Sequence, residues 1–121
     1  MSNWIAVFLG GGLGSCCRYA LSLWFPPKPL SFPFATLAAN VLSCVVLGLA
    51  ARYFLPKVPL HESWKLLVMV GFCGGFSTFS TFSRESLLLM QQGAALQAAF
   101  YILLSISSCI FLLWGIDQVK F

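Results

Sequence analysis

Apolar residues in this chain fall into four long stretches, separated by short segments rich in polar residues or proline. The stretches run over about residues 4–25, 34–54, 64–92 and 94–116. Each has roughly the 20 residues that an α-helix needs to cross the hydrocarbon core of a bilayer. The pattern therefore predicts an all-α membrane protein with four transmembrane helices, in which residues 1–121 form a single domain.

The third stretch is interrupted near residues 74–78. Paired glycines and five hydroxyl residues crowd into segment 71–83, and this composition disfavours a continuous helix. Phe76, Phe79 and Phe82 recur at intervals of three, which places their rings along one edge of a helix. Backbone groups freed by a break cannot face lipid, because each unsatisfied group there costs several kcal/mol. The break is therefore a candidate functional site, expected close to the glycine pair.

The second and fourth stretches each carry polar residues on one helical face. In the second, Thr36, Asn40 and Ser43 follow an i, i+4, i+7 pattern, so they share a face that must meet protein or water. The Asn40 amide could offer donors to an anion or bind a neighbouring helix, and the pattern leaves both interpretations open. The fourth stretch repeats polar or thiol residues at intervals of four, with one serine beside them: Gln97, Tyr101, Ser105 and Cys109, with Ser108.

The first stretch contains a glycine cluster and a deep basic residue. Gly10 and Gly14 form a G-x-x-x-G pair, which allows close approach of another helix in lipid. A dinucleotide-binding loop is the weaker alternative, because the G-x-G-x-x-G spacing and a preceding strand are both missing. Arg18 lies deeper than topology charges usually do. It faces either a water-filled cavity or partner, or it snorkels to the interface, and the sequence favours neither.

Composition supports a membrane protein without a soluble domain. The chain is 60% hydrophobic and 8% charged, against about 25% charged residues in soluble domains. Its net charge of +4 includes no basic run of the kind that binds nucleic acid. The N-terminus lacks signal-peptide features, so we expect the first stretch to be retained. Five cysteines in apolar stretches, without a C-x-x-C spacing, indicate packing residues rather than disulfides or a zinc site: Cys16, Cys17, Cys44, Cys73 and Cys109.

Charges near the predicted helix ends bear on topology. Four spans place both termini on one side, together with Arg52, Lys57, Lys65 and Lys120, against Lys28 on the other side. This bias favours cytoplasmic termini, but so few charges leave the orientation open. Four thin helices can hardly enclose a polar pathway alone, so we expect a two-fold dimer.

The polar groups in the spans are almost all uncharged. Glu62, Glu85 and Asp117 are expected near helix ends or loops, and His61 in a loop beside Glu62. A small multidrug-type exporter, which couples transport to protons, needs a carboxylate deep in a span, so coupled export is disfavoured. Hydroxyl and amide donors, with the positive edges of phenyl rings, instead suit passive conduction of a small, hard anion. A structural subunit, with the polar faces holding helices together, is the third hypothesis; nothing predicts an enzyme.

Carbonyl groups released by the break offer a second site. They form an oxygen cage suited to a monovalent cation, and a dimer axis would let two breaks share it. Neighbouring side chains could equally satisfy these carbonyls.

Three motifs together resemble the Fluc, or CrcB, family of bacterial fluoride channels. They are G-G-G-L-G-S at residues 10–15 followed by Arg18 and Tyr19, T-x-x-x-N from Thr36 to Asn40, and G-F-C-G-G-F-S-T-F-S-T-F at residues 71–82. The resemblance covers nearly the whole chain. It implies an antiparallel, dual-topology homodimer in the bacterial plasma membrane, with two fluoride pores and a structural, non-transported sodium ion at its centre. It also implies passive export that lowers cytoplasmic fluoride.

The resemblance also assigns roles to individual residues. Arg18 would be the vestibule arginine, and the backbone carbonyls of Gly74 and Ser77 would bind sodium, Ser77 standing where the family often has threonine. Cys109 stands where a hydroxyl residue is common, so Ser108 is an alternative at that position. The residues assigned to the fluoride pore are Asn40, Phe79, Phe82, Ser80, Thr81, Tyr101, Ser105 and Ser108.

Overall fold

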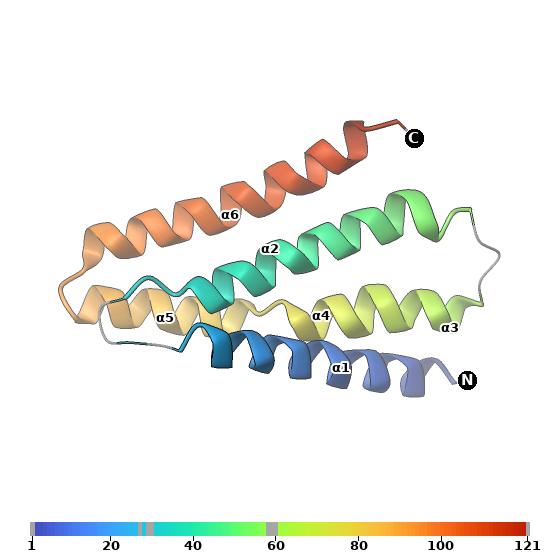
Figure 1. Cartoon of the computed structure of the whole chain (residues 1–121), viewed down its shortest axis with the longest axis horizontal. Coiled ribbons are helices and arrows are strands. Elements are labelled where there is room, and N and C mark those ends of the chain that lie inside the picture. The colour runs from blue at the N-terminus through green and yellow to red at the C-terminus, as the bar shows by residue number, and fades with distance from the viewer. Residues whose placement is uncertain (1, 27, 29–30, 58–60, 121) are drawn as a thin grey trace.

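The computed structural model describes residues 2–26, 28, 31–57 and 61–120, and all regular secondary structure in these ranges is helical. Four helical rods run alongside one another, and both termini lie at the same end of the bundle (Figure 1). Four helices are long and apolar enough to cross a membrane: Asn3–Trp24, Phe34–Tyr53, Glu62–Gln91 and Ala95–Gln118. The predicted all-α architecture with four spans is confirmed.

The first and last spans are single helices, whereas the middle two are composite. The second span joins an α-helix to a π-helical turn, and the third consists of four consecutive segments. The π-helical turns, with their i to i+5 hydrogen bonds, have no signal in the sequence pattern. The elements are α1 (Asn3–Trp24), α2 (Phe34–Leu49), η1 (Ala50–Phe54), α3 (Glu62–Lys65), η2 (Leu66–Phe72), α4 (Cys73–Phe76), α5 (Phe79–Gln91) and α6 (Ala95–Gln118).

Glycine brings α1 against the third span at backbone distance. A Cβ atom on Gly10 would lie 2.1 Å from the Leu67 carbonyl oxygen, and one on Gly75 would lie 2.3 Å from that of Gly11. A Cβ on Gly14 would meet the Phe72 carbonyl at 2.2 Å. No side chain fits at these contacts, so the close-packing interpretation of the G-x-x-x-G pair is confirmed.

The break lies just after the glycine pair, not at it. The helix continues through Gly74 and Gly75 to Phe76. Ser77 (ψ 158°) and Thr78 (φ −152°, ψ 120°) are extended. Helix α5 then begins with Thr78 as its N-cap, since its Oγ1 accepts a hydrogen bond from the Thr81 N–H at 3.2 Å. The extended residues lie inside the expected range of residues 74–78. The glycine pair itself stays helical, because the Thr78 hydroxyl caps the next helix and Gly75 contacts α1.

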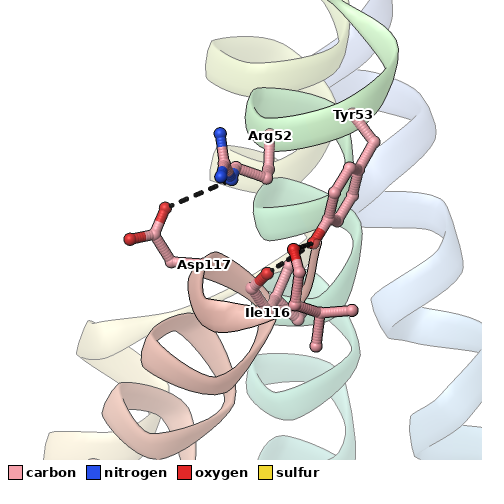
Figure 2. A network of polar contacts seen from close by, with 5 residues as sticks. Arg52, Tyr53, Ile116 and Asp117 are labelled. Carbon is pink, nitrogen blue, oxygen red and sulfur yellow. Dashed lines mark hydrogen bonds and ion pairs between the residues drawn. The ribbon is translucent and has the colours of Figure 1, made fainter. Parts of the chain in front are cut away.

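Helix α6 packs on α2, and its C-terminal end is tied to the end of the second span. The Tyr53 hydroxyl donates to the Ile116 carbonyl at 2.7 Å and also contacts the Val119 carbonyl, while Arg52 Nε lies 3.7 Å from Asp117 Oδ1 (Figure 2). The order across the bundle is thus α1, third span, α2, α6 (Figure 1). The third span lies between α1 and α2, so the break is packed against protein on two sides.

Candidate functional site: a polar groove beside the broken helix

The side-chain amide of Asn40 in α2 binds the backbone of the break through both its oxygen and its nitrogen atom. Its Oδ1 accepts a hydrogen bond from the Thr78 N–H at 2.8 Å, and its Nδ2 donates to the Thr78 carbonyl at 3.3 Å. An amide nitrogen carries two N–H groups, so one remains for another acceptor. Both interpretations of Asn40 therefore stay compatible: it holds two helices together and keeps a donor at the break.

Two carbonyl groups next to the break have lost their helical partners. In a continuous helix the Gly74 carbonyl would accept from the Thr78 N–H, and the Ser77 carbonyl from the Thr81 N–H. Here the Thr78 N–H binds Asn40, and the Thr81 N–H binds the Thr78 hydroxyl. A Cβ atom added to Gly74 would have open space around it. Both carbonyls thus fit the requirement for oxygen ligands of a small cation.

A groove of about 300 Å³ lies beside the break, between α2, α5 and α6. The Phe79 and Phe82 rings lie 5.6 Å apart, Phe82 buried in the bundle and Phe79 with 78% of its surface exposed. Almost all of the remaining lining is uncharged polar, thiol or aliphatic. The groove is lined by Asn40, Cys44, Ser77, Thr78, Phe79, Phe82, Ser105, Ile106, Cys109 and Ile110.

Ser105 places an unpaired hydroxyl group in this groove. Among the described residues, its Oγ is the one buried side-chain nitrogen or oxygen that has no hydrogen-bond partner. Leaving such a group unsatisfied costs about 1–3 kcal/mol. By contrast, the neighbouring Ser108 Oγ donates to the Ser105 carbonyl at 3.2 Å. Ser105 therefore keeps an O–H donor that no other protein group uses.

Arg18 lies at the end of the helix that precedes the break. Its Nε donates to the Gly75 carbonyl at 3.2 Å, and the Ser15 hydroxyl reaches the same oxygen at 3.5 Å. A cation there is also favoured by the negative end of the helix dipole. Arg18 lines a second, larger cavity of about 790 Å³ together with Lys28 and Glu85. The sequence left two interpretations of Arg18 open. The structure supports the first, in which Arg18 faces a cavity and binds a partner group, and not the second, in which it snorkels to the membrane interface.

Glu85 is the functional candidate that the sequence pattern missed. It was expected near a helix end or loop but lies in the middle of α5, where it lines the larger cavity, is half-buried and has both of its oxygens bound. Thr36 Oγ1 donates to Oε1 at 2.6 Å, and the Tyr101 hydroxyl donates to Oε2 at 2.9 Å. The spacing of three that links Phe79 and Phe82 continues to Glu85, and this would have indicated its inward position.

The comparisons with known proteins agree with this architecture. Residues 5–116 match the sequence profile described as CrcB-like protein, Camphor Resistance (CrcB). The chain belongs to the CrcB family. A CrcB relative from Serratia proteamaculans, named fluoride-specific ion channel FluC, is 43% identical over 107 residues, which cover 88% of this chain and 84% of the relative. Relatives of the same name from Escherichia fergusonii and Escherichia coli are 45% and 44% identical over 89 residues, 74% of this chain and 70% of each relative.

The structure does not bring all of the pore residues expected from the CrcB resemblance together. Asn40, Phe79, Phe82 and Ser105 meet in the groove. Thr81 lines the larger cavity, and Tyr101 is fully buried with its hydroxyl on Glu85. Ser80 is exposed, 3.4 Å from the Thr78 hydroxyl, while Ser108 is outside the groove lining that includes Cys109.

Proposed function

We propose that this protein is a passive, fluoride-selective channel that lets fluoride leave the bacterial cytoplasm across the plasma membrane. The observation that carries the proposal is the groove itself. It gathers an amide donor from Asn40, an unpaired hydroxyl from Ser105 and the ring of Phe82 beside a break in a membrane-spanning helix. The fluoride-specific names of relatives that share 43–45% identity support the choice of ion.

Uncharged donors explain why an anion could both enter and leave. The N–H of Asn40 and the O–H of Ser105 would replace part of the hydration shell of fluoride, and the positive ring edges of Phe79 and Phe82 would add weak attraction. A cationic side chain at this point would hold the anion too firmly. Ser80, Thr81, Tyr101 and Ser108 would continue the polar track. Arg18 would raise the anion concentration in the larger cavity.

The channel would be an antiparallel, dual-topology homodimer with two pores. The groove is open on the surface of one chain, and the Phe79 ring that borders it is largely exposed. Amide and hydroxyl groups of the groove would be unfavourable if they faced lipid, because hydrocarbon satisfies no hydrogen bond. A second copy of the chain would cover the groove.

A structural sodium ion would stabilise this dimer at its centre. The carbonyl groups of Gly74 and Ser77, which have lost their helical N–H partners, would supply oxygen ligands from each chain. Among the described residues, no three His, Cys, Asp or Glu side chains are grouped to hold a metal ion. The backbone would therefore be the source of ligands, and the ion would stay in place during transport.

Flux from liposomes tests the proposal against a proton-coupled exporter, the alternative that the half-buried Glu85 carboxylate favours. Reconstituted protein should release fluoride down its gradient, at a rate that follows the membrane voltage and does not depend on an imposed pH gradient. Release that requires a pH gradient, or proton-driven uptake of organic cations, would support the exporter instead. Absence of any flux from folded protein would support a structural role.

A further inference from the structure

The groove contains a pair of thiols that the proposed conduction of fluoride does not need. Cys44 of α2 and Cys109 of α6 both line it, and both are half-buried and free. The two helices that carry them pack against each other, so both thiols border the same groove of about 300 Å³. The i, i+4 spacing places Cys44 below Asn40 and Cys109 below Ser105 on the same faces, so the thiol pair continues the polar groove.

The surroundings of the pair select the kind of ligand. Beside the thiols lie Ile106 and Ile110 on the groove wall, without a carboxylate or imidazole. Cys73 is buried outside the groove lining, and its backbone carbonyl accepts a hydrogen bond from the Ser43 hydroxyl at 2.9 Å. Hard or four-coordinate cations such as Mg²⁺ and Zn²⁺ would find too few ligands here. Two opposed sulfur atoms instead suit a soft ion that prefers two ligands in a line.

We propose that Cys44 and Cys109 form a two-thiolate binding site for a soft divalent cation of the Hg²⁺ class, which closes the groove when bound. With mercuric chloride, both S–H bonds break, two S–Hg bonds form, and two chloride ions and two protons leave without electron transfer. The product is neutral, like the two thiols it replaces, so the apolar wall imposes no new charge. The closing of the groove rests on the proposed function, whereas binding of the metal does not.

Mass spectrometry of the intact chain tests the site independently of transport. The protein for this test carries Cys16→Ala, Cys17→Ala and Cys73→Ala, which leaves only the groove pair. One equivalent of mercuric chloride should add one mercury and remove two hydrogens, the signature of a bridge. With Cys109→Ser or Cys44→Ser added, the chain should instead gain one mercury with one chloride and lose one hydrogen.

Fluoride flux from liposomes then tests closure. Mercuric chloride should lower the flux of the pair-only protein about tenfold or more, and excess dithiothreitol should restore it; a tenfold change corresponds to 1.4 kcal/mol. The Cys109→Ser protein keeps a side chain of similar size without the second sulfur, so its adduct should be removed by a lower concentration of dithiothreitol. Zn²⁺ should neither form an adduct nor change the flux.

Several results would overturn the inference. An adduct that retains chloride in the pair-only protein, or two mercury atoms per chain, would show that the thiols bind separately. A chain that is two hydrogens lighter before treatment would show a disulfide instead. A bridged adduct with unchanged flux would refute closure. If the untreated protein passes no fluoride, the proposed function fails, while the mass measurement still decides the metal site.

Discussion

At the residue scale, the groove depends on donors that the protein leaves unused. A serine inside an apolar helix usually bonds to a carbonyl of the preceding turn, as Ser107 does with Leu103 at 2.5 Å. Ser105, two positions earlier, has no such bond although it is buried. The difference leaves the Ser105 hydroxyl as a donor that its own helix does not use.

Replacing Ser105 by alanine should therefore separate function from stability. We expect fluoride flux to fall about tenfold, which is the loss of one donor worth about 1.4 kcal/mol to the permeating ion. Thermal stability in detergent should be unchanged or higher, because an unpaired buried hydroxyl is removed. Ser107→Ala, on the exposed face of the same helix, is the control and should retain flux. Equal flux in both variants would contradict the role of Ser105.

Phe82 provides a second test at this scale. Phe82→Ile keeps the site apolar but removes the ring edge, so flux should fall about tenfold or more while the dimer persists. Phe111→Ile on exposed α6 surface is the matched control. Size-exclusion chromatography would confirm assembly of both proteins, and wild-type flux in Phe82→Ile would rule the ring out as part of the pore wall.

At the element scale, the broken third span positions the groove. Asn40 holds the two extended residues of the break from α2, and Gly75 holds the preceding helix against α1. The break is therefore stabilised from two sides, and Arg18 binds the Gly75 carbonyl at the end of the preceding helix. The contact made by Asn40 can be tested by fluoride flux, and the contact made by Gly75 by thermal stability.

Asn40→Asp should abolish most of the flux. Aspartate cannot donate to the Thr78 carbonyl, and it adds a negative charge to an anion path, so binding of fluoride is disfavoured twice. The effect should be largest above the pKa of the new carboxyl group and partly reversed at low pH, where protonation removes the charge. Flux measured from pH 5 to pH 8 would show this slope, and a flat, wild-type profile would contradict it.

Gly75→Ala should weaken packing rather than conduction alone. The new Cβ would lie 2.3 Å from the Gly11 carbonyl oxygen, so α1 and α4 must separate, at a cost of about 1–3 kcal/mol. Gly12→Ala, whose Cβ would meet nothing within 4 Å, should not lose stability. Thermal denaturation in detergent compares the two, and equal stability would argue against a backbone contact at Gly75.

The number of helices, their approximate ends and the polar faces could be predicted from periodicity and length. The segment that contains the break, near residues 74–78, could also be predicted. The role of the glycine pair could not, because glycine pairs signal both flexibility and close packing, and only contact with Gly11 shows which applies at Gly75. The bonds of Glu85 to Thr36 and Tyr101 were also out of reach, since they join three helices. The π-helical turns η1 and η2 have no compositional signature.

At the scale of the whole molecule, the single chain leaves the groove open on its outer surface. Exposed aromatic residues cover its outer surface, and the groove opens on that surface. An antiparallel second copy would enclose the groove and bring two sets of Gly74 and Ser77 carbonyls together. In this arrangement the sodium ion would hold the dimer together, so removing sodium should affect both assembly and flux.

Replacing sodium by a large organic cation should destabilise the dimer and lower fluoride flux, because the freed carbonyl groups would no longer have a cation to bind. Flux and size-exclusion profiles in sodium, potassium and N-methylglucamine solutions would test this. Recovery on adding sodium back is the expected control. Identical flux and assembly in all three solutions would contradict a structural sodium ion.

The most direct test of the account is a comparison of fluoride and chloride efflux from the same proteoliposomes. We expect the protein to pass fluoride rapidly and to exclude chloride almost completely. Protein that passes chloride as readily as fluoride, or passes neither ion although folded and reconstituted, would contradict the central claim.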